Sequence, residues 1–150
     1  MRVVIQRVSE VTVTVEGQLK GACGKGLMIL AGIEESDTQE DIDWLSRKIV
    51  NMRIFNNDEG KMNLSVKEVN GGILVISQFT LFASTQKGNR PSFIRAARSE
   101  KAIPLYNKFV TAMERELGKP VATGEFGAHM IASLTNDGPV TIIIDSKIKE

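Results

Sequence analysis

Hydroxyl and amide side chains interrupt an apolar stretch near the middle of the chain. Residues 72–76 read Gly-Ile-Leu-Val-Ile, which is typical of a buried strand, and Ser77, Gln78 and Thr80 follow closely. A buried hydroxyl or amide costs free energy unless it finds a hydrogen-bond partner. These side chains therefore either line a pocket, where they and nearby main-chain N–H groups grip a carbonyl group, or satisfy backbone groups at the end of a sheet.

Side-chain alternation along this segment predicts which residues act together. Ser77, Phe79 and Leu81 share one face if the strand stays regular. Gln78 and Thr80 then share the other face. In a pocket Thr80 is a possible nucleophile, but such a nucleophile needs an activating base, and the sequence offers no obvious one.

A second polar segment, Asn136-Asp137-Gly138-Pro139-Val140-Thr141, leads into an apolar strand-like run. A Gly-Pro pair before a strand is most often part of a turn. A rigid dipeptide can also hold main-chain carbonyl groups in fixed positions, which side chains with free torsions do less well. The segment is therefore either a turn or the stiff wall of a site.

Other reactive side chains are few. The only cysteine, Cys23, stands among small residues, and we expect it to pack rather than react. The only histidine, His129, falls in an apolar run at 128–134, where we expect a hydrogen-bonded packing residue; a Ser-His-Asp triad with it would lack a nucleophile elbow. The chain has no Walker loop, no GxGxxG fingerprint and no paired-cysteine zinc motif, so we expect neither a metal nor a cofactor.

Global charge does not indicate a nucleic-acid partner, because 19 basic and 18 acidic residues give a net charge of +1. Any such partner has to be held locally. The densest cationic segment, interleaved with Asn89 and Phe93, comprises Lys87, Arg90, Arg95, Arg98 and Lys101. This segment is either a phosphate-binding loop beside the polar strand end or a solvated surface loop.

The elements that would position these residues fit one domain spanning residues 1–150, with a hydrophobic content of 42%. Apolar patterning predicts strands at 1–15, up to Cys23, at 27–33, at 128–134 and at 140–144, with 135–139 as a connection. Turn signals at 56–60 and 70–72 favour antiparallel pairing.

Two helices are expected. Asp37 and Glu40 look like a capping pair that opens the first, whose apolar residues recur at helical spacing as far as Met52. The second covers about 100–117 and stops at Gly118. Many strands with two isolated helices predict an α+β fold, with a mostly antiparallel, barrel-like sheet and not a doubly wound one.

Targeting signals are not apparent in the sequence. It has no run of about 18 apolar residues and no basic segment followed by an apolar one. We therefore expect a cytoplasmic protein with no membrane partner.

Two motifs in this order, SQFTLFA at 77–83 and NDGPVT at 136–141, resemble those of the D-aminoacyl-tRNA deacylases. The opening MRVVIQRV at 1–8 and the strand beginning at Gly26 fit the same family, so the resemblance covers the whole chain. It implies a homodimeric, metal-independent esterase that frees D-amino acids, and also glycine, from wrongly charged tRNA. The aminoacylated 3′ end of tRNA is then the expected partner.

The resemblance also implies a catalytic wall. Its members would be Ser77, Gln78, Phe79 and Thr80. Main-chain N–H groups near Phe79 and Thr80 would hold the ester carbonyl, so that Thr80 becomes a donor instead of a nucleophile.

A chirality filter is implied in the second motif. Gly138 and Pro139 match a Gly-cisPro dipeptide that reaches into the partner subunit's site and excludes L-amino acids. Arg7 matches the arginine that braces this dipeptide. Asn136 and Thr141 flank it as supporting residues.

The chemistry expected of such a site is modest. An aminoacyl ester is already activated, so preorganised N–H groups at the developing oxyanion can suffice without a histidine base. We expect water to attack, helped by the ribose 2′-hydroxyl of the substrate, as the resemblance also suggests. Glycine has no side chain to clash with a steric wall, so glycyl-tRNA should react as well.

Two other classes of function stay open. The first is a non-catalytic module that binds RNA ends or nucleotides through the cationic segment. The second is a hydrolase of small metabolites that uses Thr80 as its nucleophile. Incubation with D-tyrosyl-tRNA and L-tyrosyl-tRNA separates the three possibilities.

Overall fold

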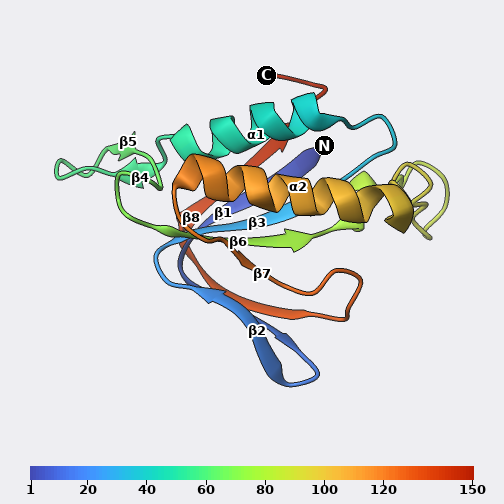
Figure 1. Cartoon of the computed structure of the whole chain (residues 1–150), viewed down its shortest axis with the longest axis horizontal. Coiled ribbons are helices and arrows are strands. Elements are labelled where there is room, and N and C mark those ends of the chain that lie inside the picture. The colour runs from blue at the N-terminus through green and yellow to red at the C-terminus, as the bar shows by residue number, and fades with distance from the viewer.

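A computed structural model describes residues 1–150 and shows two helices lying across one side of a curved sheet (Figure 1). The sheet has the strand order β2-β1-β3-β6-β7, and β8 also pairs with β1. Its strands are β1 (Arg2–Val15), β2 (Gln18–Cys23), β3 (Gly26–Gly32), β6 (Gly72–Ser77), β7 (Ala122–Thr123) and β8 (Ile131–Asp145). The remaining elements are β4 (Phe55–Asn56) paired with β5 (Met62–Leu64), the helices α1 (Gln39–Asn51) and α2 (Ser99–Leu117), and the short 3₁₀ helix η1 (Phe79–Phe82).

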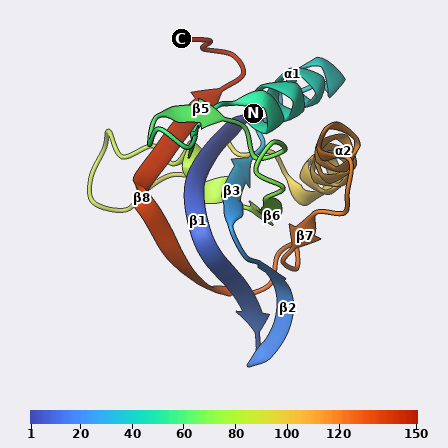
Figure 2. The same cartoon turned by 90° about the vertical axis from the view of Figure 1, so that its left-hand side faces the viewer.

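The central strand β1 has three partners. Along one edge its first half pairs antiparallel with β3 and its second half with β2, whereas β8 runs antiparallel along the other edge. A strand that serves two partners on one edge has to bend, and the sheet curls into a nearly closed, barrel-like form (Figure 2). The predicted α+β fold with mostly antiparallel pairing is confirmed; β3–β6 and β6–β7 are the parallel pairs.

Close backbone approach joins β3 to β6. The two strands start side by side, and a Cβ added at Gly26 would lie 1.9 Å from the carbonyl oxygen of Gly72. No side chain fits there, so glycine is required at this position. The register that follows carries β6 along β3 as far as Ser77.

The main hydrophobic core lies between the sheet and the two helices. Val3 and Ile5 of β1, Leu45 of α1 and Phe109 of α2 are fully buried in it. Tyr106 also packs there, and its hydroxyl donates a hydrogen bond to the carbonyl oxygen of Val75, 3.0 Å away. Neither helix is long and apolar enough to cross a membrane.

The start of α1 differs from the expected capping pair of Asp37 and Glu40. Thr38 is the N-cap, and its capping box is closed by Asp41, whose carboxylate accepts a hydrogen bond from the Thr38 main-chain N–H at 2.8 Å. Asp37 is occupied elsewhere, because the buried α-ammonium group of Met1 donates to its carboxylate. Asp37, which the local pattern predicts to cap α1, therefore forms a tertiary ion pair instead.

The second helix was predicted closely. Helix α2 covers Ser99–Leu117 and ends at Gly118, which adopts a left-handed conformation. By contrast, the predicted strands at 128–134 and 140–144 are wrong as two separate elements. One continuous strand, β8, begins at Ile131, and residues 135–139 belong to it.

Candidate active site

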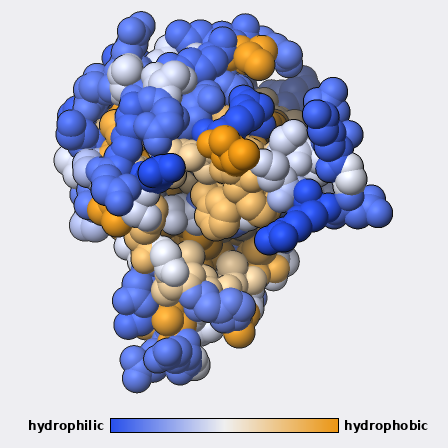
Figure 3. Space-filling model, turned by 90° about the vertical axis from the view of Figure 1, so that its right-hand side faces the viewer, coloured by the Kyte–Doolittle hydropathy of each residue, from blue (hydrophilic) through white to orange (hydrophobic).

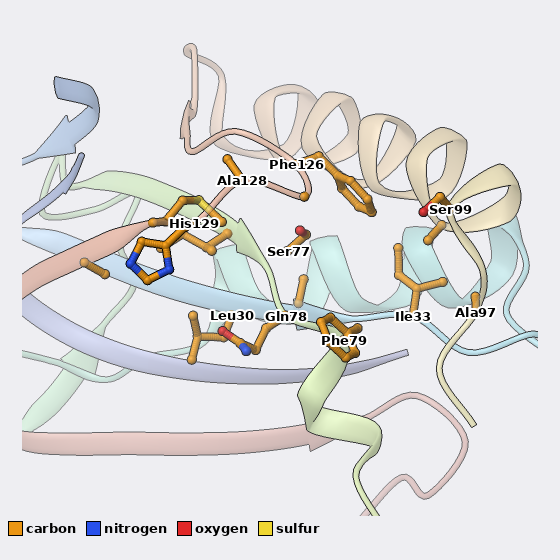
Figure 4. A pocket seen from close by; sticks show the side chains of 16 residues that line it. Leu30, Ile33, Ser77, Gln78, Phe79, Ala97, Ser99, Phe126, Ala128 and His129 are labelled. Carbon is orange, nitrogen blue, oxygen red and sulfur yellow. The ribbon is translucent and has the colours of Figure 1, made fainter. Parts of the chain in front are cut away.

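A cavity of about 440 Å³ opens at the end of β6 where the loop after β7 meets the first residues of α2. Apolar surface lies at the centre of this face of the molecule, with strongly hydrophilic groups on both sides (Figure 3). The cavity is lined mainly by apolar side chains, and Ser77, Gln78 and Phe79 stand among them (Figure 4). Three segments that are distant in the sequence therefore form one site.

Strand β6 ends at Ser77, so the side-chain alternation predicted through Leu81 is wrong. The Gln78 N–H still donates to the carbonyl oxygen of Ala31 on β3, 2.8 Å away, but Gln78 already departs from strand geometry. The chain then turns into η1 over Phe79–Phe82. The turn brings Ser77, Gln78 and Phe79 to the cavity together, whereas Thr80 is exposed and does not line it.

Free main-chain donors stand at the start of η1. The first N–H groups of a helix have no acceptor within the helix. Those of Phe79 and Thr80 donate to no other group of the chain, whereas the Leu81 N–H returns to the carbonyl oxygen of Gln78 at 3.3 Å. Two adjacent N–H groups are thus available beside the cavity to bind an oxygen atom.

The hydroxyl group of Thr80 has one partner in the chain, the Gln78 amide, which donates a hydrogen bond to it. An amide cannot accept the proton of a nucleophilic hydroxyl. The contact therefore fixes the Gln78 side chain next to η1 and gives Thr80 no activating base.

The opposite wall comes from the loop between β7 and β8, which no motif in the sequence predicts to be part of the site. Phe126, Ala128, His129 and Met130 line the cavity from this loop (Figure 4). The prediction of His129 as a hydrogen-bonded packing residue on a strand is wrong, because His129 precedes β8, is exposed and has no hydrogen-bond partner in the chain. The closely spaced glycines Gly124 and Gly127 were the available signal for a loop here.

The second motif forms a wide bulge in β8. Thr141 pairs with Gln6 and Asn136 with Val8, so residues 137–140 stand opposite Arg7 alone. The Gly138–Pro139 peptide bond is cis, and Gly138 has a φ of +131°, which favours glycine. A Cβ at Gly138 would also lie 3.1 Å from a guanidinium nitrogen of Arg7.

Arg7 ties this bulge to the body of the protein. Its side chain is 8% exposed; Nη1 donates to the carbonyl oxygen of Ile54 at 2.7 Å and Nε to that of Asp137 at 3.0 Å. Charged donors to carbonyl groups make strong hydrogen bonds when shielded from water. The guanidinium group thus holds the strand at the residue preceding Gly138.

Asn136 closes the bulge from within. Its side-chain oxygen accepts a hydrogen bond from the Val140 N–H, and its amide nitrogen donates to the Thr141 hydroxyl, each at 3.2 Å. Both contacts span the Gly138-Pro139 dipeptide. The dipeptide is therefore fixed on both sides, by Arg7 before it and by the Asn136 side chain across it.

The two motifs do not meet within one chain. None of residues 136–141 lines the cavity. The dipeptide instead lies on a strand whose other edge pairs with no element of this chain, and Ile131 and Ile143 of that strand are 59% and 68% exposed.

Acidic and thiol groups take no visible part in the site. No three His, Cys, Asp or Glu side chains cluster closely enough to hold a metal ion. Cys23 packs beside the smaller core cluster at the end of β2, and burial raises the pKa of its thiol although Lys119 acts in the opposite direction. A raised pKa keeps the thiol protonated and poorly nucleophilic.

Comparisons with known proteins show the family to which this chain belongs. A family model described as D-Tyr-tRNA(Tyr) deacylase matches residues 4–145. Proteins named D-aminoacyl-tRNA deacylase from Flavobacterium psychrophilum and Bacteroides thetaiotaomicron are 63% and 61% identical to this chain, with 100% of both chains covered. A solved structure named c-Myc DNA unwinding element binding protein has a TM-score of 0.89 and 40% identity, and covers 97% of this chain and 98% of that chain. With a family model matching almost all of the sequence and relatives this similar along their full length, the chain belongs to the D-Tyr-tRNA(Tyr) deacylase family.

Proposed function

We propose that this protein hydrolyses the ester bond of D-aminoacyl-tRNA and of glycyl-tRNA, releasing the amino acid and free tRNA. Its family and the names of its relatives identify it as a hydrolase acting on the esters of aminoacyl-tRNA. The observation that carries the chemistry is the pair of free N–H groups at the start of η1, that of Phe79, which lines the cavity, and that of its neighbour Thr80. Because tRNA is the substrate, we expect the enzyme to act in the cytoplasm.

The reaction needs stabilisation of charge more than a strong base. Water adds to the ester carbonyl carbon, the carbonyl oxygen becomes an oxyanion, and the bond to the ribose oxygen then breaks. The leaving oxygen takes up the proton that water gives. One preorganised donor at an oxyanion lowers a barrier by roughly 3–4 kcal/mol, so the N–H groups of Phe79 and Thr80 could supply much of what an activated ester requires.

Proton transfer is proposed to fall to the substrate. The Thr80 hydroxyl is hydrogen-bonded only to the Gln78 amide, and His129 has no side-chain partner to orient it as a base. The 2′-hydroxyl of the terminal ribose lies next to the ester in any aminoacyl-tRNA and can relay the proton from water. This assignment makes Gln78 and Thr80 positioning residues and leaves the covalent step to water.

The cavity suits the terminal nucleoside of the tRNA. Its volume of about 440 Å³ is in the range of ligand pockets, and its surface is mainly apolar. Phe126 and Phe79 offer aromatic faces and Met130 a polarizable side chain, which are groups that bind a nucleobase by stacking and dispersion. The ester would then lie near Ser77 and the start of η1.

Selection against L-amino acids is proposed to need a second copy of the chain. The Gly138-Pro139 dipeptide does not reach the cavity of its own chain, yet Arg7 and Asn136 hold it firmly. The free edge of β8, with exposed Ile131 and Ile143, gives a partner copy a surface to pack on. Carbonyl groups of the partner's dipeptide would occupy the space of an L side chain, whereas glycine has none to exclude.

The decisive experiment compares three substrates with chelator present. D-tyrosyl-tRNA and glycyl-tRNA should lose their amino acid, and L-tyrosyl-tRNA should remain intact. Equal loss of the D and L esters would disprove the steric filter. Rapid turnover of a D-tyrosyl-tRNA that ends in 2′-deoxyadenosine would disprove the role of the 2′-hydroxyl.

A second candidate is nucleic-acid binding without hydrolysis. It is favoured by one similar structure, whose name describes a protein that binds a DNA unwinding element. Tight binding of tRNA with no ester loss for any of the three substrates would support this candidate. A Thr80-dependent esterase, the third possibility, requires near-total loss of activity in Thr80→Ala, whereas we expect Thr80→Ala to keep the main-chain donors and substantial activity.

A further inference from the structure

The cationic segment 84–101 begins and ends beside the cavity. It leaves η1 just after Phe82 and enters α2, whose first residue Ser99 lines the cavity together with Ala97. Figure 1 shows this stretch as a loop at the end of the molecule where α2 begins. The segment thus connects two parts of the cavity wall, Phe79 in η1 and Ala97 before α2.

Hydrogen bonds fix the path of the segment at both ends. Ser84 and Ser92 exchange two backbone hydrogen bonds of 2.8 and 2.9 Å, which close a hairpin around Lys87 and Arg90. The Ala97 N–H donates to the carbonyl oxygen of Ile33 at 2.9 Å. The base of the hairpin is therefore fixed, and Figure 2 shows its tip extending past β8, on the side away from α2.

Charge in the protein is concentrated on this segment. It contains five of the 19 basic residues and only one acidic residue, Glu100, so it carries a net charge of +4 in a chain with a net charge of +1. The rest of the chain is accordingly net negative. An electrostatic field of this kind attracts a polyanion to one place instead of to the whole surface.

Three of these cations have no partner for their side chains. Lys87, Arg90 and Arg98 are exposed and form neither an ion pair nor a side-chain hydrogen bond. In contrast, Arg95 pairs with Glu34 at 3.8 Å, and the Lys101 ammonium group donates to the carbonyl oxygen of Glu35. The free cations are thus available to an external anion.

Exposed aromatic rings accompany the free cations. Phe79 and Phe93 meet edge to face with centroids 5.2 Å apart, and they are 56% and 38% exposed. Together they bridge the lip of the cavity and the cationic segment. Aromatic rings next to cations are the usual composition of a surface that binds single-stranded nucleic acid.

We propose that Lys87, Arg90 and Arg98 bind phosphate groups of the tRNA strand that leads to the aminoacylated 3′ end, while Phe93 contacts the base before the terminal one. This proposal rests on the proposed function, since it takes the cavity to hold the terminal nucleoside. The segment acts in binding and does not take part in ester cleavage.

The expected effect follows from the release of counterions. Each phosphate contact on a single strand contributes a slope of about −0.7 to a plot of log affinity against log salt concentration. Three contacts give a slope of about −2. With this slope, binding in 0.15 M salt is roughly 10- to 50-fold tighter than binding in 1 M salt, where these contacts contribute little. Removal of all three side chains should weaken tRNA binding by about this factor and flatten the salt dependence.

The test uses a triple variant, Lys87→Gln with Arg90→Gln and Arg98→Gln, in the full-length protein. Binding of uncharged tRNA is measured by fluorescence anisotropy across a salt series, and hydrolysis is measured for D-tyrosyl-tRNA and for D-tyrosyl-adenosine, which has no phosphate. We expect KM for D-tyrosyl-tRNA to rise by about tenfold or more at 0.15 M salt with kcat nearly unchanged. Hydrolysis of D-tyrosyl-adenosine should not change.

A matched control removes three exposed cations from other surfaces, with Lys20→Gln, Lys25→Gln and Lys108→Gln. An equal loss of tRNA binding in this control would overturn the proposal, because the effect would then come from total charge. Unchanged affinity and salt slope in the first variant would overturn it as well. If the wild-type protein hydrolyses neither substrate, the proposed function fails, while the anisotropy measurement still decides whether these cations bind tRNA.

Discussion

Replacement of Arg7 tests whether rigidity of the β8 bulge sets the choice between D and L substrates. Arg7→Met keeps an unbranched apolar side chain at this position but removes the guanidinium group. The hydrogen bonds to the carbonyl groups of Ile54 and Asp137 are then lost. Hydrogen bonds from a charged group contribute roughly 1.5–3 kcal/mol each, and methionine avoids the cost of burying a charge. We therefore expect the free energy of unfolding to fall by about 2–4 kcal/mol.

Part of that energy holds the Gly138-Pro139 dipeptide in place, so its loss should weaken the rejection of L-amino acids. If only about 1.4 kcal/mol of it positions the dipeptide, the ratio of kcat/KM for D-tyrosyl-tRNA over L-tyrosyl-tRNA falls about tenfold. The assay is the initial rate of ester loss with each substrate, together with thermal unfolding of the same preparation. The D rate itself should change less than the ratio.

A control has to separate loss of stability from loss of the brace. Leu117→Ala serves this purpose, because Leu117 is buried at the far end of α2 from the cavity and its truncation costs about 2–5 kcal/mol. This variant should unfold at a lower temperature and keep the wild-type ratio of D to L rates.

The reasoning would be refuted if Arg7→Met is destabilised as expected and still rejects L-tyrosyl-tRNA as the wild type does. If Arg7→Met does not fold, Asn136→Ala provides a milder test, since it removes the two neutral hydrogen bonds to Val140 and Thr141. Those bonds contribute roughly 0.5–1.5 kcal/mol each. An unchanged ratio in Asn136→Ala would then count against the braced wall.

Three further outcomes are expected. Burial raises the pKa of Tyr106 to about 12, so its hydroxyl stays protonated and donates to Val75; Tyr106→Phe should lower the melting temperature by roughly 2–4 °C and leave ester hydrolysis unchanged in kinetic assays. Burial alone would raise the pKa of Asp41, but hydrogen bonds, the strongest from Lys147, lower it below its usual value. The ionised Asp41 carboxylate therefore contributes its full stabilisation above about pH 4, and this contribution is lost as the pH falls further. In urea unfolding from pH 7 to 3, Asp41→Asn should be less stable than wild type at pH 7. Its free energy of unfolding should also fall less than that of the wild type on acidification. The raised pKa of the Cys23 thiol predicts slow reaction with iodoacetamide at pH 7 and full activity after modification is attempted.

Local patterns in the sequence predict much of this fold. The period of the apolar residues gives both helices, and Gly118 ends the second as expected. The break from apolar to polar residues at Ser77 correctly marks an irregular point, since β6 ends there and Ser77, Gln78 and Phe79 reach the cavity. These features depend on neighbours in the chain, so the sequence alone is enough to find them.

Features that depend on distant partners were predicted wrongly or not at all. Asp37 does not cap α1 because the α-ammonium of Met1, 36 residues away, takes its carboxylate. His129 and Phe126 belong to the site only because the loop before β8 folds over the end of β6. The periodicity of apolar residues does not predict contacts between segments that are far apart in the sequence.

The bulge in β8 shows the same division most clearly. The sequence by itself identifies NDGPVT as a segment with a rigid dipeptide, because glycine and proline restrict the backbone wherever they occur. Only the tertiary structure makes that segment part of a continuous strand. Strand β1 pairs with β8 before and after the bulge, and the buried Arg7 guanidinium holds the unpaired residues 137–140 between the two paired regions. The physical reason is that a strand is stabilised by hydrogen bonds to another strand, and the identity of that partner is not written in the strand's own residues.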